Sequence, residues 1–246
     1  MKGQGPAVVI RSPRPEEKAD LLRLQARSFG KDVPYFRRIW DTDPRHSDEC
    51  ARLLLEDGDP VAYLRYAPWK MHLRGRVVRF GGLAEVCSLP RVRGRGYLWR
   101  LMEQILPDHL ARGFFINLLH GDPNLYRRFG WETACDFSHV KKDVKSLKVP
   151  RARGKVRAFR RSDLPVLSGL YDEKAAGLPI MAARDHRHWR GCVLKKLKVF
   201  GMRGLVYERN GGMEGYAFVK AKAKEIHFAN LRQLTFGGTN AEAYWS

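Results

Sequence analysis

The sequence predicts an α/β fold, and three observations support this prediction. Short β-branched or apolar runs alternate with Leu-rich segments of helical periodicity, which is the pattern of strands and helices packed in layers. Of the 246 residues, 44% are hydrophobic, enough to bury the core of one large or two small domains. The order of the first elements also returns in the second half of the chain.

The first elements are a strand and two helices. Residues 7–11 (AVVIR) form a β-branched run, and residues 13–29 place two acids in a first helical turn, where the helix dipole favours negative charge. A second helix is expected up to the stop at Asp43 and Pro44. The residues expected to face the core are Leu21, Leu22, Leu24 and Phe29 from the first helix, and Tyr35, Phe36, Ile39 and Trp40 from the second.

Three strands, a helix, a strand and a short helix follow. Segments 51–57, 61–73 and 76–89 have strand-like composition, and the sequence GDP at 58–60 predicts a hairpin turn between the first two. After a basic loop, the expected elements are a helix at 97–113, a buried strand at 114–120 and a short helix at 123–131, closed by Gly130.

A partial second unit with the layout of the first is predicted after a linker. The stretch 143–155 contains Pro, Gly and five basic groups. Residues 156–175 then repeat the short strand, basic turn, cap and Leu-rich helix of residues 8–29. The repeat stops before any counterpart of the basic loop. We therefore expect a first domain at 1–145, a linker at 146–155 and a partial or degenerate second copy at 156–246.

The chain is strongly basic. It has 46 Lys and Arg against 26 Asp and Glu, a formal net charge of +20. Such a charge attracts polyanions: nucleic acid, an anionic membrane surface, or a multiply phosphorylated small molecule. Because the basic residues are spread over both halves of the chain, a solvated basic surface is the simpler interpretation.

Cysteine usage and the first residues indicate a cytoplasmic protein. The four cysteines lie far apart, with no CxxC pair and no His at metal-ligand spacing, so neither disulfides nor a structural metal site is expected. The first residues lack the apolar region of a signal peptide. No stretch approaches the roughly 18 consecutive apolar residues of a membrane span, so none is predicted.

The sequence LPRVRGRGYLWRLM (89–102) is a candidate anion-binding loop. A strand that ends in Pro, a loop with two glycines and a helix that starts at once turn backbone N–H groups toward an anion. The glycines let the backbone approach a ligand closely. The segment matches neither GxGxxG nor GxxxxGK[ST], so it indicates neither a Rossmann fold nor a P-loop. The alternative is a basic turn with capping glycines.

This loop, with the later strand and YxxxG-aromatic segment, resembles the GNAT acetyltransferase superfamily. The resemblance implies a mixed, mostly antiparallel sheet flanked by helices, and a segment R/Q-x-x-G-x-G/A that wraps the pyrophosphate of acetyl-coenzyme A. A register that starts at Arg91 matches every position of the motif, whereas one that starts at Arg93 places Leu101 and Met102 at the apolar pair of the family's helix but puts Leu98 at the last Gly/Ala. We prefer the second register, because helix packing fixes register more firmly. With Leu98 at the last Gly/Ala position, the loop resembles that of the tandem-domain acetyltransferases typified by the enhanced-intracellular-survival proteins. The expected coenzyme-binding residues here are Arg93, Gly94, Arg95, Gly96, Tyr97, Leu98 and Trp99.

The second motif, GDPNLYRRFGWE, contains a candidate acid. The resembling family has a Tyr four residues before a Gly, as Tyr126 and Gly130 stand here. In that family the Tyr hydroxyl lies near the coenzyme sulfur and can protonate the departing thiolate, which requires a donor with a pKa above that of the thiol. The resemblance implies this role for Tyr126. Asp122 and Pro123 would lie beside the coenzyme. The alternative is that Tyr126 is only a core aromatic.

Glu85 is the lone acid of the apolar run GGLAEVCSL and is a candidate base. A carboxylate in mid-strand must face solvent, a partner or a site. In many relatives an acid at this height of the strand receives the amine proton, usually through water. The family's splayed strand offers backbone amides, here Val86, Cys87 and Ser88, to the pantetheine arm. The alternative for Glu85 is an ion pair with an arginine; Cys87 is not expected to be a nucleophile.

The resemblance implies an N-acetyltransferase with acetyl-coenzyme A as cosubstrate, no metal, and direct transfer to an unidentified amine acceptor. One alternative is a non-enzymatic, basic nucleic-acid-binding protein on a degenerate acyltransferase fold, although no nucleic-acid-binding motif is present. Another is a non-catalytic scaffold that dimerises through its second half. The sequence leaves weak polyanion binding and a homo-oligomeric state open.

Overall fold

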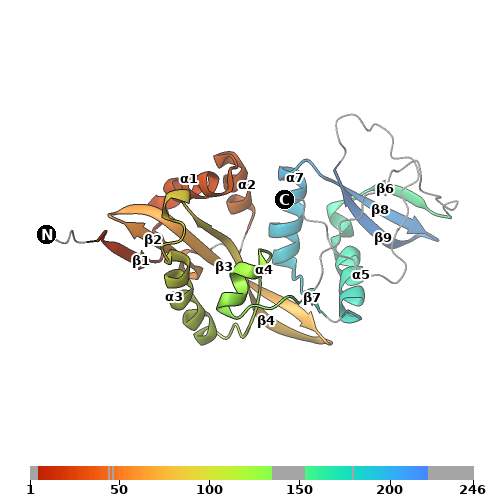
Figure 1. The fold of residues 1–246 in the computed structure, drawn as a ribbon. Helices are drawn as coiled ribbons and strands as arrows, with labels where there is room; N and C mark the ends of the chain where they lie inside the picture. Colours follow the sequence, from red (N-terminus) through yellow and green to blue (C-terminus); the bar gives the residue numbers. More distant parts are fainter. Residues whose placement is uncertain (1–4, 44, 46, 135–152, 179, 221–246) are drawn as a thin grey trace. The chain divides into compact units, whose positions relative to one another are not determined.

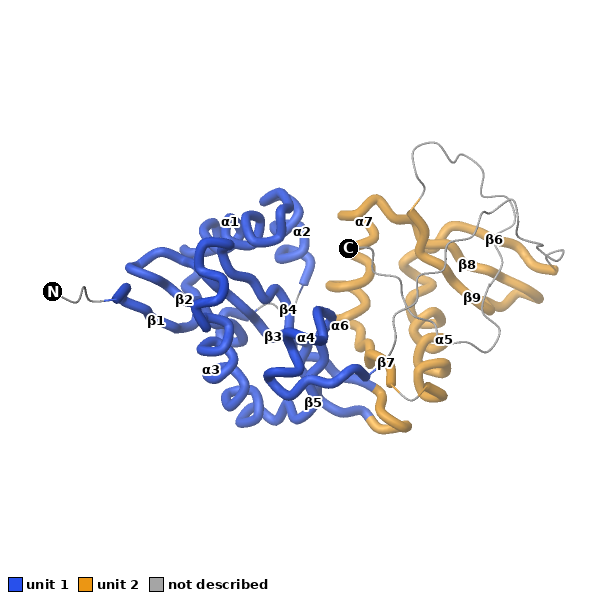
Figure 2. Tube along the Cα trace, viewed as in Figure 1, with its two compact units in different colours: residues 1–71, 77–134 blue, residues 72–76, 135–246 orange. Residues whose placement is uncertain are grey.

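The computed structural model describes residues 5–43, 45, 47–134, 153–178 and 180–220. These residues belong to two compact units, shown in different colours in Figure 2. The first unit contains residues 1–71 and 77–134, and the second contains 72–76 together with 135–246.

The sheet of the first unit has the strand order β1-β2-β3-β4-β5. Figure 1 labels β1 to β4, and Figure 2 labels β5. Its strands are β1 (Val8–Arg11), β2 (Ala51–Glu56), β3 (Asp59–Leu73), β4 (Arg76–Ser88) and β5 (Ile116–Leu118). β1 pairs antiparallel with β2, β2 pairs antiparallel with β3, and β4 pairs parallel with β5. The predicted mixed, mostly antiparallel sheet is therefore confirmed.

The helices of this unit lie within the segments that the sequence predicts as helical. They are α1 (Lys18–Phe29), α2 (Val33–Thr42), α3 (Tyr97–Ala111) and α4 (Pro123–Tyr126), with 3₁₀ turns at Pro15–Glu17, Asp48–Cys50, Pro90–Val92 and Arg127–Phe129. Gly30 ends α1 with a left-handed φ of 64°. The Asp32 carboxylate caps α2 by accepting from the Tyr35 N–H at 2.8 Å.

Helices α1 and α3 cover opposite faces of the sheet. Glu85 of β4 accepts hydrogen bonds from both Gln25 of α1 and Arg65 of β3, so the Arg65 side chain lies on the α1 face. The next residue of β3, Tyr66, stacks on His109 of α3, with ring centroids 3.3 Å apart. Neighbouring residues of a strand point to opposite faces, so the two helices lie on different sides.

Of the eight helix positions expected to face the core of the first unit, five are buried, Tyr35 and Ile39 are partly buried, and Phe29 is exposed. Among the predicted helix positions, the buried ones are Leu21, Leu22, Leu24, Phe36 and Trp40. Phe29 was expected to face the core, but its side chain is 46% exposed. It is the last residue of α1, and its ring contacts Phe36 of α2 at 5.6 Å between centroids. The prediction was wrong because periodicity cannot tell that the helix end extends past the core.

The second unit has its own three-stranded sheet and core. Its elements are β6 (Lys155–Ala158), α5 (Leu164–Ala176), β7 (Ile180–Ala182), α6 (His186–His188), a π-helical turn (Trp189–Leu194), α7 (Lys195–Val199), β8 (Arg203–Arg209) and β9 (Gly212–Val219). Strand β8 lies between β6 and β9 and is antiparallel to both. The core is formed by Leu164, Leu167, Tyr171, Ala175 and Trp189.

Strands β1 and β6 are each joined to the helix that follows by the same arrangement of an arginine and a carboxylate. Arg11 at the end of β1 binds the Glu17 carboxylate at 2.8 Å, and that carboxylate also accepts from the backbone N–H three residues before it. Arg157 in β6 binds Asp163 at 2.7 Å, and Asp163 likewise accepts from the N–H three residues before it. A strand, an Arg–carboxylate pair at a spacing of six and a helix therefore recur, as the internal repeat predicts.

Several sequence predictions lie outside the described residues. These include most of the linker at 146–155, Cys135 and the KAKAKE segment beyond Lys220. The other three cysteines, Cys50, Cys87 and Cys192, are buried. In the described ranges, no helix combines the length and apolar character needed to cross a membrane. The boundaries of the two domains remain a prediction.

Candidate active site

Strands β4 and β5 pair only over a short stretch and then separate. The parallel pairing joins Phe80–Gly82 of β4 to Ile116–Leu118 of β5. Strand β4 continues for another six residues, to Ser88. One edge of β4 is therefore not paired with β5 beyond Gly82, which is where the sequence predicts the pantetheine arm.

Strand geometry decides which N–H groups point to this edge. The Leu89 N–H donates to the Val61 carbonyl of β3 at 2.9 Å. Successive N–H groups of a strand point to opposite edges, so the N–H groups of Ser88 and Val86 point away from β3. The Cys87 N–H points toward β3. Of the three predicted pantetheine-binding residues, two therefore direct their amides to the open edge.

The basic loop leads into a helix N-terminus without a side-chain cap. Gly94 and Gly96 have φ angles of 80° and 75°, and Gly96 is the N-cap residue of α3. Because glycine has no side chain, it cannot accept from the first-turn N–H groups of Tyr97, Leu98 and Trp99. These donors, together with the positive end of the helix dipole, are suited to bind an anion.

Two other predicted amides are used within the loop. The Arg93 N–H donates to the Pro90 carbonyl at 3.3 Å, and the Arg95 N–H donates to the Val92 carbonyl at 3.4 Å. These bonds form the turns that lead into α3. Of the backbone N–H groups predicted to bind the anion, those of the glycines and of the first helical turn therefore remain as candidates.

The packing of α3 agrees with the register that starts at Arg93. Leu101 and Met102 are both fully buried in the core of the first unit. The helix begins at Tyr97, directly after the glycine that this register aligns with the family's conserved Gly. Leu101 and Met102 are therefore core residues, as the register that starts at Arg93 requires, and the register itself stays a prediction.

The arginine side chains of the loop do not extend freely into solvent. Arg91 and Arg95 each bind the Glu56 carboxylate at 2.7 Å, and the Tyr97 hydroxyl also donates to it. The Arg93 guanidinium donates to the Ser28 carbonyl at 3.2 Å. The loop is therefore attached to the fold through its charged side chains, while its backbone forms the candidate binding surface.

Tyr126 lies at the end of α4 and is 9% exposed. The Asp122 carboxylate caps this helix by accepting from the Asn124 N–H at 2.9 Å, and Pro123 occupies the first helical position. A Cβ on Gly121 would lie 2.3 Å from the Tyr126 ring, so the chain needs glycine there. Burial raises the pKa of Tyr126, which keeps its hydroxyl protonated at neutral pH.

The Glu85 carboxylate forms the ion pair that the sequence left open as an alternative. It accepts from the Arg65 Nε at 2.9 Å and from the Gln25 Nε2 at 2.7 Å. Glu85 has a φ of 56°, a left-handed conformation that is uncommon for residues other than Gly, Asn and Asp. Its two contacts hold the carboxylate in this bend of β4.

Arg65 is the centre of a buried charge cluster. Its side chain is 3% exposed and binds both Glu85 and, at 3.1 Å, Asp43. Burial alone would raise the pKa of Asp43, but Arg45 and Arg65 outweigh that effect and hold it below its usual range. Burial also raises the pKa of the Cys87 thiol, which argues against Cys87 as a nucleophile.

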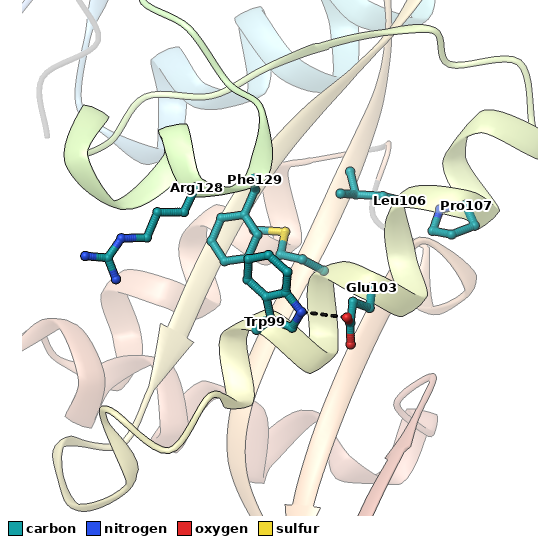
Figure 3. A pocket seen from close by; sticks show the side chains of 7 residues that line it. Trp99, Glu103, Leu106, Pro107, Arg128 and Phe129 are labelled. Carbon is teal, nitrogen blue, oxygen red and sulfur yellow. Dashed lines mark hydrogen bonds between the residues drawn. The ribbon is translucent and has the colours of Figure 1, made fainter.

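A shallow pocket of about 340 Å³ lies between α3 and the 3₁₀ turn that follows α4 (Figure 3). Trp99 and Phe129 pack with ring centroids 5.1 Å apart, and the Trp99 indole N–H donates to Glu103 at 2.6 Å. Arg128 extends beside them in Figure 3. In the described residues, no group of three His, Cys, Asp or Glu side chains is arranged to hold a metal ion.

Sequence reasoning missed the partners of the site residues. Arg65 is the only charged residue in VAYLRYA, as Glu85 is in GGLAEVCSL, so two lone opposite charges in neighbouring strands could have indicated the pair. No local signal indicates Glu56, whose contacts lie at least 35 residues along the chain. The pocket beside Trp99 is formed in part by the 3₁₀ turn at Arg127–Phe129, which follows α4. The sequence of α3 alone therefore does not indicate it.

Comparison with known proteins identifies the fold. A family model described as an acetyltransferase (GNAT) domain matches residues 9–134, just over half of the chain. No curated protein matches the sequence. The structure resembles a probable N-acyltransferase from Enterococcus faecalis V583, a conserved protein of unknown function, with a TM-score of 0.69 and 16% identity over 89% of this chain and 56% of that one.

Two further solved structures show the same architecture. A GCN5-related N-acetyltransferase from Anabaena variabilis has a TM-score of 0.66 and 17% identity, covering 86% of this chain and 54% of that one. The N-myristoyltransferase of Saccharomyces cerevisiae, solved with bound myristoyl-CoA, has a TM-score of 0.59 and 12% identity, covering 86% and 59%. The chain spans little more than half the length of these proteins, and at such identities the likeness shows the fold alone.

The match of the family model, together with the mixed sheet, the separated β4 and β5 and the loop before α3, shows that the chain belongs to the GNAT acetyltransferase family.

Proposed function

We propose that the protein is an acetyl-coenzyme A-dependent N-acetyltransferase that transfers the acetyl group directly to a substrate amine. The observation that supports this most is the uncapped first turn of α3, which follows β4 and its open edge along the chain. The first-turn N–H groups of α3 bind the coenzyme diphosphate, and those of Val86 and Ser88 bind the pantetheine arm. The tandem-domain subgroup is the part of the family that this proposal favours, because the second unit repeats the opening elements of the first.

The transfer needs one proton acceptor and one proton donor. The amine nitrogen forms a bond to the acetyl carbonyl carbon, and the carbon–sulfur bond breaks. Tyr126, protonated and mostly buried, donates its proton to the departing sulfur. The Glu85 Oε2, which accepts from Gln25, has a second lone pair, so Glu85 can hold the water that takes the proton from the amine.

The charge of the chain favours an acceptor that is not a polycation. A net charge of +20 repels polyamines and tolerates an acidic acceptor. The acceptor test is release of the coenzyme thiol with acetyl-coenzyme A and either an acidic peptide containing one lysine or spermine. Faster turnover of the peptide supports this preference, and faster turnover of spermine contradicts it.

The coenzyme site is tested by calorimetric titration with acetyl-coenzyme A. Wild type is expected to bind with a Kd of about micromolar order, and Gly96→Glu to weaken binding at least about tenfold, because it adds a side chain and a negative charge at the diphosphate cradle. Gly75→Glu is the matched control, since Gly75 also has a positive φ, 77°, with open space at its Cβ, but lies in the β3–β4 turn. Absence of binding to wild type contradicts the proposed function.

The acid is tested with Tyr126→Phe, which keeps the shape of the buried ring. We expect kcat to fall about a hundredfold or more while the Kd for acetyl-coenzyme A stays within about twofold. An unchanged kcat would show that Tyr126 is a core aromatic and not the proton donor.

A further inference from the structure

Three side chains from the basic loop and the start of α3 converge on one buried carboxylate. Glu56, the last residue of β2, is 6% exposed. Its Oε2 accepts from Arg91 at 2.7 Å, and its Oε1 accepts from Arg95 at 2.7 Å and from the Tyr97 hydroxyl. The two arginine side chains are each half exposed. A single residue on the sheet thus connects to the start, the middle and the end of the loop.

A carboxylate is an unexpected residue at this position. The loop precedes a helix N-terminus suited to an anion, and a negative charge under it repels phosphate. It also neutralises guanidinium groups that could otherwise bind phosphate directly. Attraction of a phosphate ligand therefore cannot explain why a carboxylate stands at position 56. Some other contribution of Glu56 to binding has to outweigh the repulsion.

Two features of the loop backbone indicate that it needs side-chain contacts to hold one conformation. Gly94 and Gly96 both have positive φ angles, and no atom lies within 4 Å of the position that a Cβ would occupy on either. Glycines without side-chain packing leave the backbone free to adopt many conformations. The local N–H bonds of Arg93 and Arg95 are long, at 3.3 and 3.4 Å. The contacts to Glu56 are the short ones, and they join the loop to the sheet.

We propose that Glu56 is a positioning residue: it fixes the loop from Arg91 to Tyr97 so that the first-turn N–H groups of α3 converge on the diphosphate of the coenzyme. This inference rests on the proposed function for the identity of the ligand. Glu56 does not touch the ligand and acts through Arg91, Arg95 and Tyr97. The hydrogen bond from Tyr97 and the two arginines lower the pKa of Glu56, so the carboxylate keeps its charge at neutral pH.

The proposal predicts the direction of a charge effect. Glu56→Gln makes the protein more positive by one charge next to a polyanionic ligand. If charge alone matters, the variant binds acetyl-coenzyme A more tightly than wild type does. If Glu56 positions the loop, the variant binds about tenfold more weakly, because the N–H donors no longer converge. Tyr97→Phe, which removes one contact without changing the charge, should also weaken binding.

Glu17→Gln is the matched control for both charge and ion-pair loss. Glu17 is likewise a mostly buried carboxylate paired with an arginine, Arg11, but it has no contact with the loop. Calorimetry with acetyl-coenzyme A should give the wild-type Kd for this control. Equal or tighter binding by Glu56→Gln together with wild-type binding by Tyr97→Phe overturns the proposal.

A second measurement without ligand separates this proposal from the proposed function. Hydrogen exchange of peptides covering residues 89–99 should be faster in Glu56→Gln than in wild type, and unchanged in Glu17→Gln. If wild type does not bind acetyl-coenzyme A, the proposed function fails, while the exchange result still decides whether Glu56 holds the loop. Unchanged exchange in this segment contradicts the positioning role whatever the ligand is.

Discussion

The pH dependence of stability offers a sharp test of the core of the first unit. His109 of α3 is 1% exposed, stacks on Tyr66 and lies 5.0 Å from the Phe114 ring. Within the described part of the chain, neither of its ring nitrogens has a hydrogen-bond partner. Burial lowers the pKa of His109 to about 4, because an imidazolium would lose its hydration without gaining a partner.

The size of the effect follows from the two pKa values. In the unfolded chain the pKa of a histidine is about 6.5. Between these values the unfolded state binds one proton more than the folded state, so stability falls as the pH falls. From about pH 7 to about pH 5 the loss is about 2 kcal/mol, and it reaches about 3 kcal/mol near pH 4.

The assay is urea denaturation of wild type and His109→Leu at both pH values. Other groups titrate over the same range, so the informative quantity is the difference between the two proteins. We expect the free energy of unfolding of wild type to drop by about 2 kcal/mol more than that of the variant between about pH 7 and about pH 5. His186→Leu, which removes an exposed histidine, is the matched control. Parallel pH dependence of wild type and His109→Leu would refute the reasoning.

Two further predictions concern stability at neutral pH. Arg65→Met leaves the carboxylates of Asp43 and Glu85 without their shared cation. It should lower the free energy of unfolding, measured in urea, by about 3 kcal/mol or more. A loss below about 1 kcal/mol would show that the cluster is well solvated. Gly169→Ala should stabilise the protein by up to about 1 kcal/mol, because Gly169 lies inside α5 with open space at its Cβ. Thermal denaturation checks this second change, and a lower Tm would contradict it.

The elements of the fold could be predicted because their signals are local. The β-branched run before α1, the turn at 58–60 and the glycines that end helices depend on residues a few positions apart. The loop before α3 was found in the same way. Phe29 shows the limit of this approach, since its apolar character is local but its exposure depends on where the core ends.

Contacts between distant segments, in contrast, depend on the tertiary structure and have no local signal. The sequence placed Glu85 on a strand but could not choose between a base and an ion pair, because the choice depends on Arg65, 20 residues away, and on Gln25, 60 residues away. It predicted a basic loop, but not that Arg91 and Arg95 are held by Glu56. The separation of β4 from β5 is likewise visible only in the paired strands. The physical reason is common to all three: periodicity and turn chemistry report the conformation of neighbouring residues, whereas the partners of buried charges are set by how the sheet and its helices pack.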